Sequence, residues 1–402
     1  MSAWPALDHE SVPWTSQLRR DDLTRRQWDA SRGPYTASIP PRIADVPVQI
    51  SPAVAAEAAD ASALLTRFDA ELGASVLPFA SILLRSESAS SSQIENLTSG
   101  ARAIAETELG ERDTGNAALI VRNVRAMTAA LALTDGIDSD GIIAMHAALL
   151  SGHAPELTGA YRSQQVWIGG SSVSPHQAGF VPPIPERVPA AMDDLIEFIA
   201  RSDVPALAHS AIAHAQFETI HPFPDGNGRT GRALVQAMLR TARLTRTVTV
   251  PVSAGLLHDV DAYYAALGRY REGDVDAMVL AFSDASVFAV RSGRELAEDI
   301  EGIRGTWRDA LAGLRSDHSA RRVADLALEQ PVLSGPVVGS RLGISAPAAY
   351  RALDALVECG VLRPADSHRR NRIWIADRMI AALDAFAERA ARRRIAGGEP
   401  RP

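Results

Sequence analysis

The chain has 402 residues, of which 46% are hydrophobic and 22% are charged, and its formal net charge is −7. These values are near the averages for globular proteins that fold in water, and no apolar run approaches the ~20 residues that a membrane span requires. A single cysteine, Cys359, excludes an internal disulfide framework, and all 41 basic residues are arginine, which excludes a lysine Schiff base. The N-terminus lacks the pattern of an export signal, so we expect a cytoplasmic protein without membrane contact.

In chain order, most of the sequence predicts helices. Residues 1–50 are rich in proline and polar residues without a sustained period, which predicts an extended N-terminal segment laid over a core. Residues 51–115 and then 116–312 carry apolar residues mainly at helical spacing. The exception is 162–184, where VWI, a Gly-Gly pair and AGFV predict a β-hairpin. The expected fold is therefore mainly α, with one hairpin inside a helical core.

The stretch HPFPDGNGRTGR, residues 221–232, follows a long apolar run. Pro222 ends the preceding helix, and the glycine turn leads into a helix that is expected to begin near Gly228. A glycine turn before a helix N-terminus directs backbone N–H groups and the positive end of the helix dipole at one place, which favours an anion. Arg229 and Arg232 share a face of the first turns and can reach successive phosphates.

Two further side chains give this stretch catalytic potential. His221 is the group that can act as a base near neutral pH. Asp225 offers the single carboxylate that a phosphate-bound Mg²⁺ commonly takes from a protein. The residues together predict a site for a nucleotide polyphosphate with a base beside it.

The same twelve residues resemble the signature of the Fic (filamentation induced by cAMP) domain family, HxFx(D/E)GNGRxxR, at every defined position. The resemblance implies a helical Fic core that transfers AMP from ATP to a Tyr, Thr or Ser hydroxyl of a target protein and releases pyrophosphate. His221 would take the hydroxyl proton, and Asp225 would hold Mg²⁺. The resemblance implies a phosphate-binding role for Gly226, Asn227, Gly228, Arg229 and Arg232, with Phe223 as an anchor of the loop.

Residues 162–184 resemble the flap of that family, a hairpin whose edge pairs with the target. Trp167 and Ile168 are the candidates for this edge, and a purely structural hairpin is the alternative. Tyr264 resembles a family position near the adenine, although Tyr263 and Tyr264 at a helix boundary need no such role.

Residues 91–96, SSQIEN, resemble the inhibitory motif (S/T)xxxE(G/N) of the same family, with Ser91 and Glu95 at the required spacing. The resemblance implies that Glu95 pairs with Arg232 in the place of the γ-phosphate, within an N-terminal inhibitory helix. The alternative is a purely structural role, because Ser92 and Glu95 also match the S-x-x-E capping box found at the N-terminus of a helix.

Residues 313–395 form the last predicted domain, and from residue 315 onward the chain carries 15 Arg against 10 acidic residues, or +5, which leaves −12 for the rest. Three predicted helices and an alternating stretch, 363–377, resemble the winged helix-turn-helix domains that often follow Fic cores. The arginines that could contact DNA phosphates are Arg351, Arg369, Arg370 and Arg372. Asp354 and Glu358 lie on the same helix as Arg351, so DNA binding and protein contact stay open.

Two classes of function are compatible with these residues. The first is an autoinhibited AMP transferase, with ATP, Mg²⁺ and a target protein as partners and a homodimer as a further possibility. The second is a transcription regulator whose Fic core senses nucleotide. Within the enzyme class, transfer of another group or removal of AMP is a further alternative.

Overall fold

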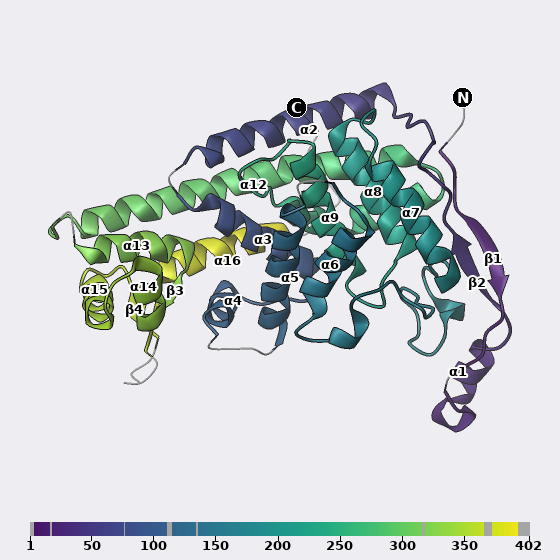
Figure 1. Cartoon of the computed structure of the whole chain (residues 1–402), viewed down its shortest axis with the longest axis horizontal. Coiled ribbons are helices and arrows are strands. Elements are labelled where there is room, and N and C mark those ends of the chain that lie inside the picture. Colours follow the sequence, from purple (N-terminus) through teal and green to yellow (C-terminus); the bar gives the residue numbers. More distant parts are fainter. Residues whose placement is uncertain are drawn as a thin grey trace. The chain divides into compact units, whose positions relative to one another are not determined.

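The computed structural model describes residues 4–16, 18–75, 77–110, 115–133, 136–315, 318–365 and 372–392. Helices dominate these residues, which confirms the mainly helical prediction (Figure 1). Contacts divide the chain into two compact units. Unit 1 comprises Met1–Ser62, Ala126–Ala242 and Asp261–Ser283, and unit 2 comprises Ala63–Arg125, Arg243–Val260 and Asp284–Pro402. The predicted domain boundaries at residues 50, 115 and 312 stay predictions.

Unit 1 holds the predicted site. Its strands are β1 (Asp8–Val12) and β2 (Tyr35–Ile39), and its helices are α1 (Arg25–Ala30), α6 (Ser139–Leu150), α7 (Val188–Ile199), α8 (Ala206–Ile220), α9 (Asn227–Thr241) and α11 (Val260–Arg271). Short 3₁₀ turns cover Arg20–Asp22, Pro155–Leu157, Pro175–Gln177 and Pro185–Arg187. Besides α11, whose first residue Val260 belongs to unit 2, three helices contain residues of both units: α2 (Pro52–Gly73), α5 (Gly115–Leu131) and α12 (Val275–Ala310).

The helix α8 lies at the centre of unit 1 and packs against α7 and α9. Every residue from Leu207 to Ile220 is buried, which explains why apolar and small residues lie on all sides of the helix, with a few buried polar side chains such as His214 and Glu218 among them. Gly231 is required at the crossing with α9, because a Cβ there would lie 2.9 Å from Cδ1 of Phe217. This close approach fixes the two helices that border residues 221–226.

The N-terminal segment is more ordered than its sequence predicts. β1 pairs antiparallel with β2, from Asp8 opposite Ile39 to Val12 opposite Tyr35, with α1 beyond the end of the two strands (Figure 1). The sequence pattern missed this pairing because each strand has only five residues. The Ser38 N–H of β2 donates to the Val181 carbonyl at 3.0 Å, so the strand pair joins the predicted flap.

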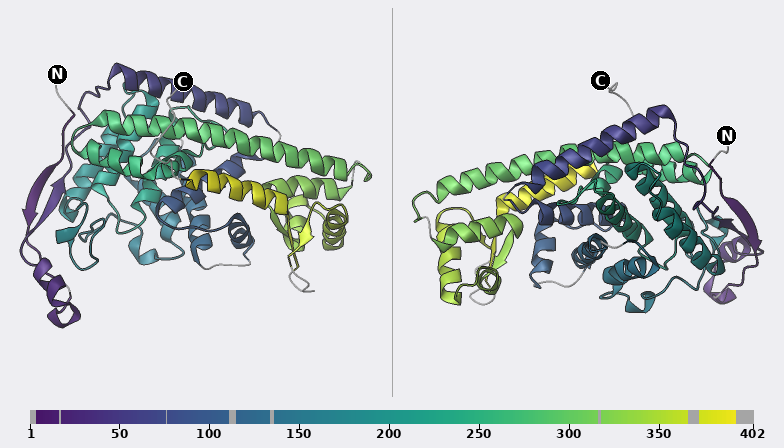
Figure 2. Two further views of the ribbon diagram at one scale, coloured as in Figure 1. Left: turned by 180° about the vertical axis from the view of Figure 1, so that it is seen from behind. Right: turned by 45° about the horizontal axis from the view of Figure 1, so that its top comes forward.

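Unit 2 contains the predicted inhibitory motif and the C-terminal helices. Its elements are α3 (Phe79–Ile94), α4 (Ala101–Glu108), α10 (Val252–His258), α13 (Ser319–Glu329), β3 (Val332–Ser334), α14 (Gly335–Leu342), α15 (Ala346–Glu358), β4 (Arg363–Pro364), β5 (Ile373–Ile375) and α16 (Asp377–Ala391). The short strands form an antiparallel sheet of order β3-β5-β4. α16 contacts α3, α4 and α10, and Figure 2 shows it from two further sides.

Within residues 313–395, the helices α13, α14 and α15 lie close to their predicted positions. The predicted alternating stretch, 363–377, contains the short strands β4 and β5. Arg369 and Arg370 lie outside the described residues. Arg372 forms an ion pair with Asp354 at 3.2 Å, and its guanidinium lies 4.7 Å from the Trp374 ring centroid. In the described parts of the chain, no helix is both long and apolar enough to cross a bilayer.

Candidate active site

The loop between α8 and α9 begins at His221, which ends α8 in the left-handed conformation, with φ 51° and ψ 61°. Its N–H still donates to the Phe217 carbonyl at 2.8 Å, so the helix closes its last turn before the chain reverses. Few residues other than glycine adopt a positive φ, and such backbone is concentrated at functional sites. Nδ1 of His221 lies 3.9 Å from Oε2 of the buried Glu218, one helical turn earlier.

Asn227 braces this loop from its far end. Its side-chain oxygen accepts the Phe223 N–H at 2.8 Å, and its side-chain NH₂ donates to the Phe223 carbonyl at 2.8 Å. Asn227 is only 2% exposed, so these two bonds satisfy backbone groups that would otherwise be buried without partners. The side chain therefore shapes the loop, and its predicted contact with an α-phosphate stays a prediction.

Phe223 is fully buried and anchors the loop, as its sequence context indicates. The imidazole of His146, from α6, stacks on its ring with a centroid distance of 3.8 Å and an interplanar angle of 2°. Nε2–H of His146 donates to the Asp225 carbonyl at 3.0 Å, because a carbonyl can only accept. Burial lowers the pKa of His146, which keeps the ring neutral. The sequence analysis missed His146, whose one signal is a histidine inside the apolar run IIAMHAALL.

Arg162 is the second residue that the sequence analysis missed. It is 3% exposed, and its guanidinium donates to the carbonyls of His221 at 2.8 Å, Pro183 at 2.6 Å and Gln164 at 3.1 Å. Its own N–H donates to the Pro222 carbonyl at 2.9 Å. Burial lowers the pKa of Arg162 to about 10, so it keeps its charge at neutral pH. One side chain thus joins the loop to both ends of the flap.

The turn ends at Gly226, the N-cap of α9, with φ 77°. A side chain there would be strained, and a Cβ would lie 2.9 Å from Cδ2 of Leu149. No side chain caps α9, so the N–H groups of its first turn, including those of Asn227 and Gly228, are available to an anion. The loop therefore delivers the chain to a helix N-terminus suited to phosphate.

Charged side chains surround this helix N-terminus. Arg229 is 5% and Arg232 is 2% exposed, whereas the Asp225 side chain is 60% exposed and lies 3.4 Å from Nη2 of Arg229. Among the described residues, no group of three or more His, Cys, Asp or Glu could hold a metal ion by itself. One exposed carboxylate fits a Mg²⁺ ion whose other ligands are phosphate oxygens and water.

The predicted flap folds back antiparallel at one bridge, between Ile168 and Phe180. Ile168 is 39% exposed, while the Trp167 indole N–H donates to the Ser171 carbonyl at 2.7 Å within the flap. The guanidinium of Arg271 lies 3.5 Å from the centroid of Phe180 and supports the return segment. Of the two candidates for the target-pairing edge, Ile168 is the one that is exposed.

The two tyrosines of α11 have different surroundings. Tyr264 is 50% exposed, whereas Tyr263 is 2% exposed and its hydroxyl lies 2.8 Å from Nε2 of His214. Burial lowers the pKa of His214 to about 3, and the charge of Arg232 acts in the same direction. Tyr263 is therefore part of the core of unit 1, and the adenine role of Tyr264 stays a prediction.

Buried neutral histidines make the stability of the protein depend on pH. The folded-state pKa of His214 is far below the value of about 6.5 in an unfolded chain, so the unfolded state binds the extra proton between these values. We expect the free energy of unfolding to fall below pH 6.5, by at most about 1.4 kcal/mol per pH unit from this residue. The urea midpoints of unfolding at pH 7.5 and 5.5 measure this decrease in the free energy of unfolding. The decrease in stability between these two pH values should be smaller in His214→Gln than in wild type. An equal decrease in both proteins would contradict the assignment of the pH dependence to His214.

The predicted inhibitory motif lies at the end of α3, not at a helix start. Glu95 is the C-cap, and Asn96 follows with φ 60°. The Leu97 N–H donates to the Ser92 carbonyl at 3.0 Å and the Asn96 N–H to the Gln93 carbonyl at 2.9 Å, which is a Schellman motif. The alternative of an N-terminal capping box is therefore wrong. The last position of the motif (S/T)xxxE(G/N), which takes Gly or Asn, is the left-handed Asn96.

Comparisons with known proteins match the segment that contains this site. Residues 136–239 match the Fic/DOC family. The chain is 35% identical over 147 residues to the protein adenylyltransferase Fic of Nematostella vectensis, which covers 35% of this chain and 30% of that protein. It is 35% identical over 103 residues to a probable protein adenylyltransferase of Aquifex aeolicus, which covers 24% of this chain and 28% of that protein. The chain thus spans under a third of the length of these relatives.

A solved structure extends the likeness in fold. A Fic family protein from Desulfovibrio desulfuricans G20 has a TM-score of 0.52 and 26% identity, and the match covers 82% of this chain and 97% of that one. Its coverage exceeds the segment that matches the family in sequence. The chain therefore contains a Fic domain over residues 136–239.

Proposed function

We propose that the protein is an autoinhibited protein adenylyltransferase, which transfers AMP from ATP to a Tyr, Thr or Ser hydroxyl of a target protein or of itself. One observation carries the proposal. The loop from His221 to Arg232 combines a left-handed histidine, an uncapped helix N-terminus and two buried arginines in twelve residues. The names of the relatives support the same activity.

Binding of ATP follows from the charges of the loop. The triphosphate lies at the N-terminus of α9, where the backbone N–H groups and the helix dipole stabilise negative charge. Arg229 and Arg232 hold the β and γ phosphates, and their burial strengthens these interactions. Asp225 would hold Mg²⁺, which would supply charge neutralisation to the phosphates.

The transfer step uses His221 as a general base. Its imidazole accepts the proton of the target hydroxyl while the hydroxyl oxygen forms a bond to the α-phosphorus. The bond between the α-phosphorus and the bridging oxygen breaks, and pyrophosphate leaves with the electron pair. The step needs alignment and charge stabilisation rather than a covalent intermediate on the protein. Arg162 and Asn227 serve as positioning residues.

The flap positions the target. The Ile168 side chain is exposed, while its N–H and carbonyl bond to the return segment at Gly179 and Phe180, so an extended target segment would pair with the backbone of the residues beside Ile168 and bring its hydroxyl to the site. Selectivity then depends on backbone register, with Trp167 supporting the flap from within.

Autoinhibition is assigned to α3. The Schellman motif gives Glu95 a fixed place at the last point of a helix, which suits a carboxylate that must compete with one phosphate. Glu95 would pair with Arg232 and occupy the place of the γ-phosphate. Residues 313–395 would act as a winged helix, whose contact with DNA or protein stays a prediction, as does a homodimer.

The test uses ATP labelled at the α-phosphate. Glu95→Gly protein is expected to label itself or lysate proteins at least tenfold more than wild type, because its arginine becomes available to the γ-phosphate. Glu95→Gly/His221→Ala is expected to label nothing above the blank.

Gln93→Gly is the matched control, since it introduces glycine in the same helical turn without removing the carboxylate. No label with Glu95→Gly would contradict the proposed activity. Equal activation by Gln93→Gly would contradict the proposed inhibition by the Glu95 charge.

A further inference from the structure

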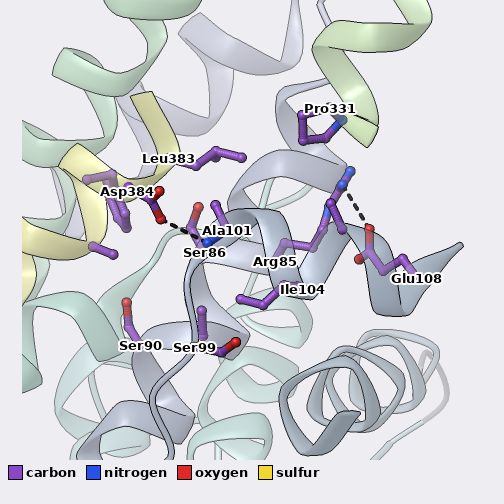
Figure 3. A pocket seen from close by; sticks show the side chains of 14 residues that line it. Arg85, Ser86, Ser90, Ser99, Ala101, Ile104, Glu108, Pro331, Leu383 and Asp384 are labelled. Carbon is purple, nitrogen blue, oxygen red and sulfur yellow. Dashed lines mark hydrogen bonds and ion pairs between the residues drawn. The ribbon is translucent and has the colours of Figure 1, made fainter. Parts of the chain in front are cut away.

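A pocket lies in unit 2 between α3, α4 and α16 (Figure 3). Its walls come from segments that are nearly 300 residues apart in sequence. The lining residues that matter most are Arg85 and Ser90 of α3, Ile104 and Glu108 of α4, and Leu383 and Ala387 of α16. The predicted C-terminal domain and the predicted inhibitory helix therefore share one cavity.

Side chains at the rim hold these walls together. Arg85 forms an ion pair with Glu108 at 3.2 Å and donates to the Glu329 carbonyl at 2.6 Å. Asp384, on α16, accepts the Ala101 N–H at 2.8 Å (Figure 3). The N-cap of α4 is Gly100, which has no side chain to perform this role, so α16 supplies the cap.

The interior of the pocket is mainly apolar. Ala89, Ile104, Ala105, Leu383 and Phe386 contribute hydrocarbon to its lining. The cavity volume is about 60 Å³, which is room for roughly four to six water-sized groups or one ring, and the pocket is partly open, so a second fused ring can extend toward solvent.

Ser90 supplies a polar group in this apolar lining. It is 3% exposed, and within the described part of the chain its hydroxyl has no hydrogen-bond partner. The hydroxyl oxygen keeps some exposure and Ser90 lines the pocket, so a ligand with a polar hydrogen can donate to it.

The pocket lies behind the inhibitory motif on α3. At about 100° per residue, the pocket-lining residues Arg85, Ser86, Ala89 and Ser90 spread over about 140° of the α3 circumference. Ser91 and Glu95 point on average about 160° away from the middle of that arc, although Glu95 is only about 80° from Arg85. Hydrogen bonds hold the other faces of α3 to its neighbours. The Asn123 side chain donates to the Ser88 carbonyl at 2.9 Å, and the Glu87 carboxylate accepts the Ser253 N–H at 2.9 Å. A molecule in the pocket therefore contacts α3 without touching the face that carries Glu95.

We propose that this pocket binds a small, mostly apolar one- or two-ring molecule with a single N–H or O–H group, and that the occupied pocket strengthens inhibition by α3. The regulatory part rests on the proposed function. A ligand that binds the arrangement in which α3, α4 and α16 are joined stabilises that arrangement by mass action. Its polar hydrogen would reach Ser90 or the carboxylate of Asp384.

The first experiment tests the site by calorimetric titration of the full chain with indole. Wild type is expected to bind one indole with a dissociation constant on the order of 1 mM or lower. Ala387→Phe and Leu383→Trp, which fill the pocket from α16, should each abolish binding. Ala381→Phe, on the exposed side of α16, should bind as wild type does. Absence of saturable binding, or equal binding by both filled variants, would overturn the site.

The second experiment tests the regulation with α-labelled ATP. Saturating indole is expected to lower labelling by wild type at least threefold, with no change in Glu95→Gly or Ala387→Phe. Unchanged wild-type labelling, or an equal decrease in Glu95→Gly, would overturn the regulatory role. If Glu95→Gly shows no label at all, the proposed function fails, and the titration alone decides whether the pocket is a binding site.

Discussion

Replacement of Arg162 by alanine in the Glu95→Gly background is expected to lower AMP transfer by about a hundredfold, since small displacements of catalytic groups cost rates of that order. The guanidinium holds the carbonyls of His221, Pro183 and Gln164, so its loss frees both the base and the flap. Initial rates of label incorporation measure the change. Hydrogen exchange of residues 162–184 should rise in parallel.

Arg187→Ala is the control for this prediction. Arg187 lies in the same unit, and its ion pair with Glu10, at 2.6 Å, is at the surface, where such pairs contribute little. It should therefore keep nearly full activity. A rate for Arg162→Ala within threefold of its parent would show that the loop keeps its shape without the guanidinium.

Asn227→Ala is expected to cause the second large loss, about a hundredfold in transfer and about 2–6 kcal/mol in the free energy of unfolding. It leaves both the N–H and the carbonyl of Phe223 buried without a partner, at about 1–3 kcal/mol each. Asn227→Asp distinguishes the two roles of the side chain, support of the loop and contact with phosphate. It keeps the oxygen that accepts the Phe223 N–H and loses the NH₂ group that donates to the Phe223 carbonyl.

Thermal unfolding and titration with ATP measure the two effects. If Asn227 mainly braces the loop, Asn227→Asp should unfold at a temperature between those of alanine and wild type. A wild-type melting temperature for Asn227→Ala together with lost ATP binding would instead assign the side chain to the phosphate.

The sequence predicted the parts of this site that depend on local spacing. Pro222, the glycine turn and the two arginines act within twelve residues, so their pattern was enough to locate a helix end, a turn and a helix start. The flap was found for the same reason, since its strand-like runs and turn residues are adjacent.

Residues that act over long distances in sequence gave no such pattern. Arg162 bonds to a carbonyl 59 residues away and His146 to one 79 residues away, and their partners are backbone atoms that any residue type supplies. Asp384 caps a helix 283 residues earlier. For α3, spacing alone allowed two structures, and only the left-handed Asn96 distinguished a helix end from a helix start.

The cap that Asp384 provides also sets an order of events during synthesis. Every residue of unit 1 precedes residue 284, whereas α4 in unit 2 must wait for α16 to receive its N-terminal hydrogen-bond acceptor. At about 5–20 residues per second, the ribosome needs roughly 6–24 s to make residues 284–402. During that interval the new polypeptide carries a complete HPFPDGNGRTGR loop before the structure that supports α3, the proposed inhibitory helix, can assemble.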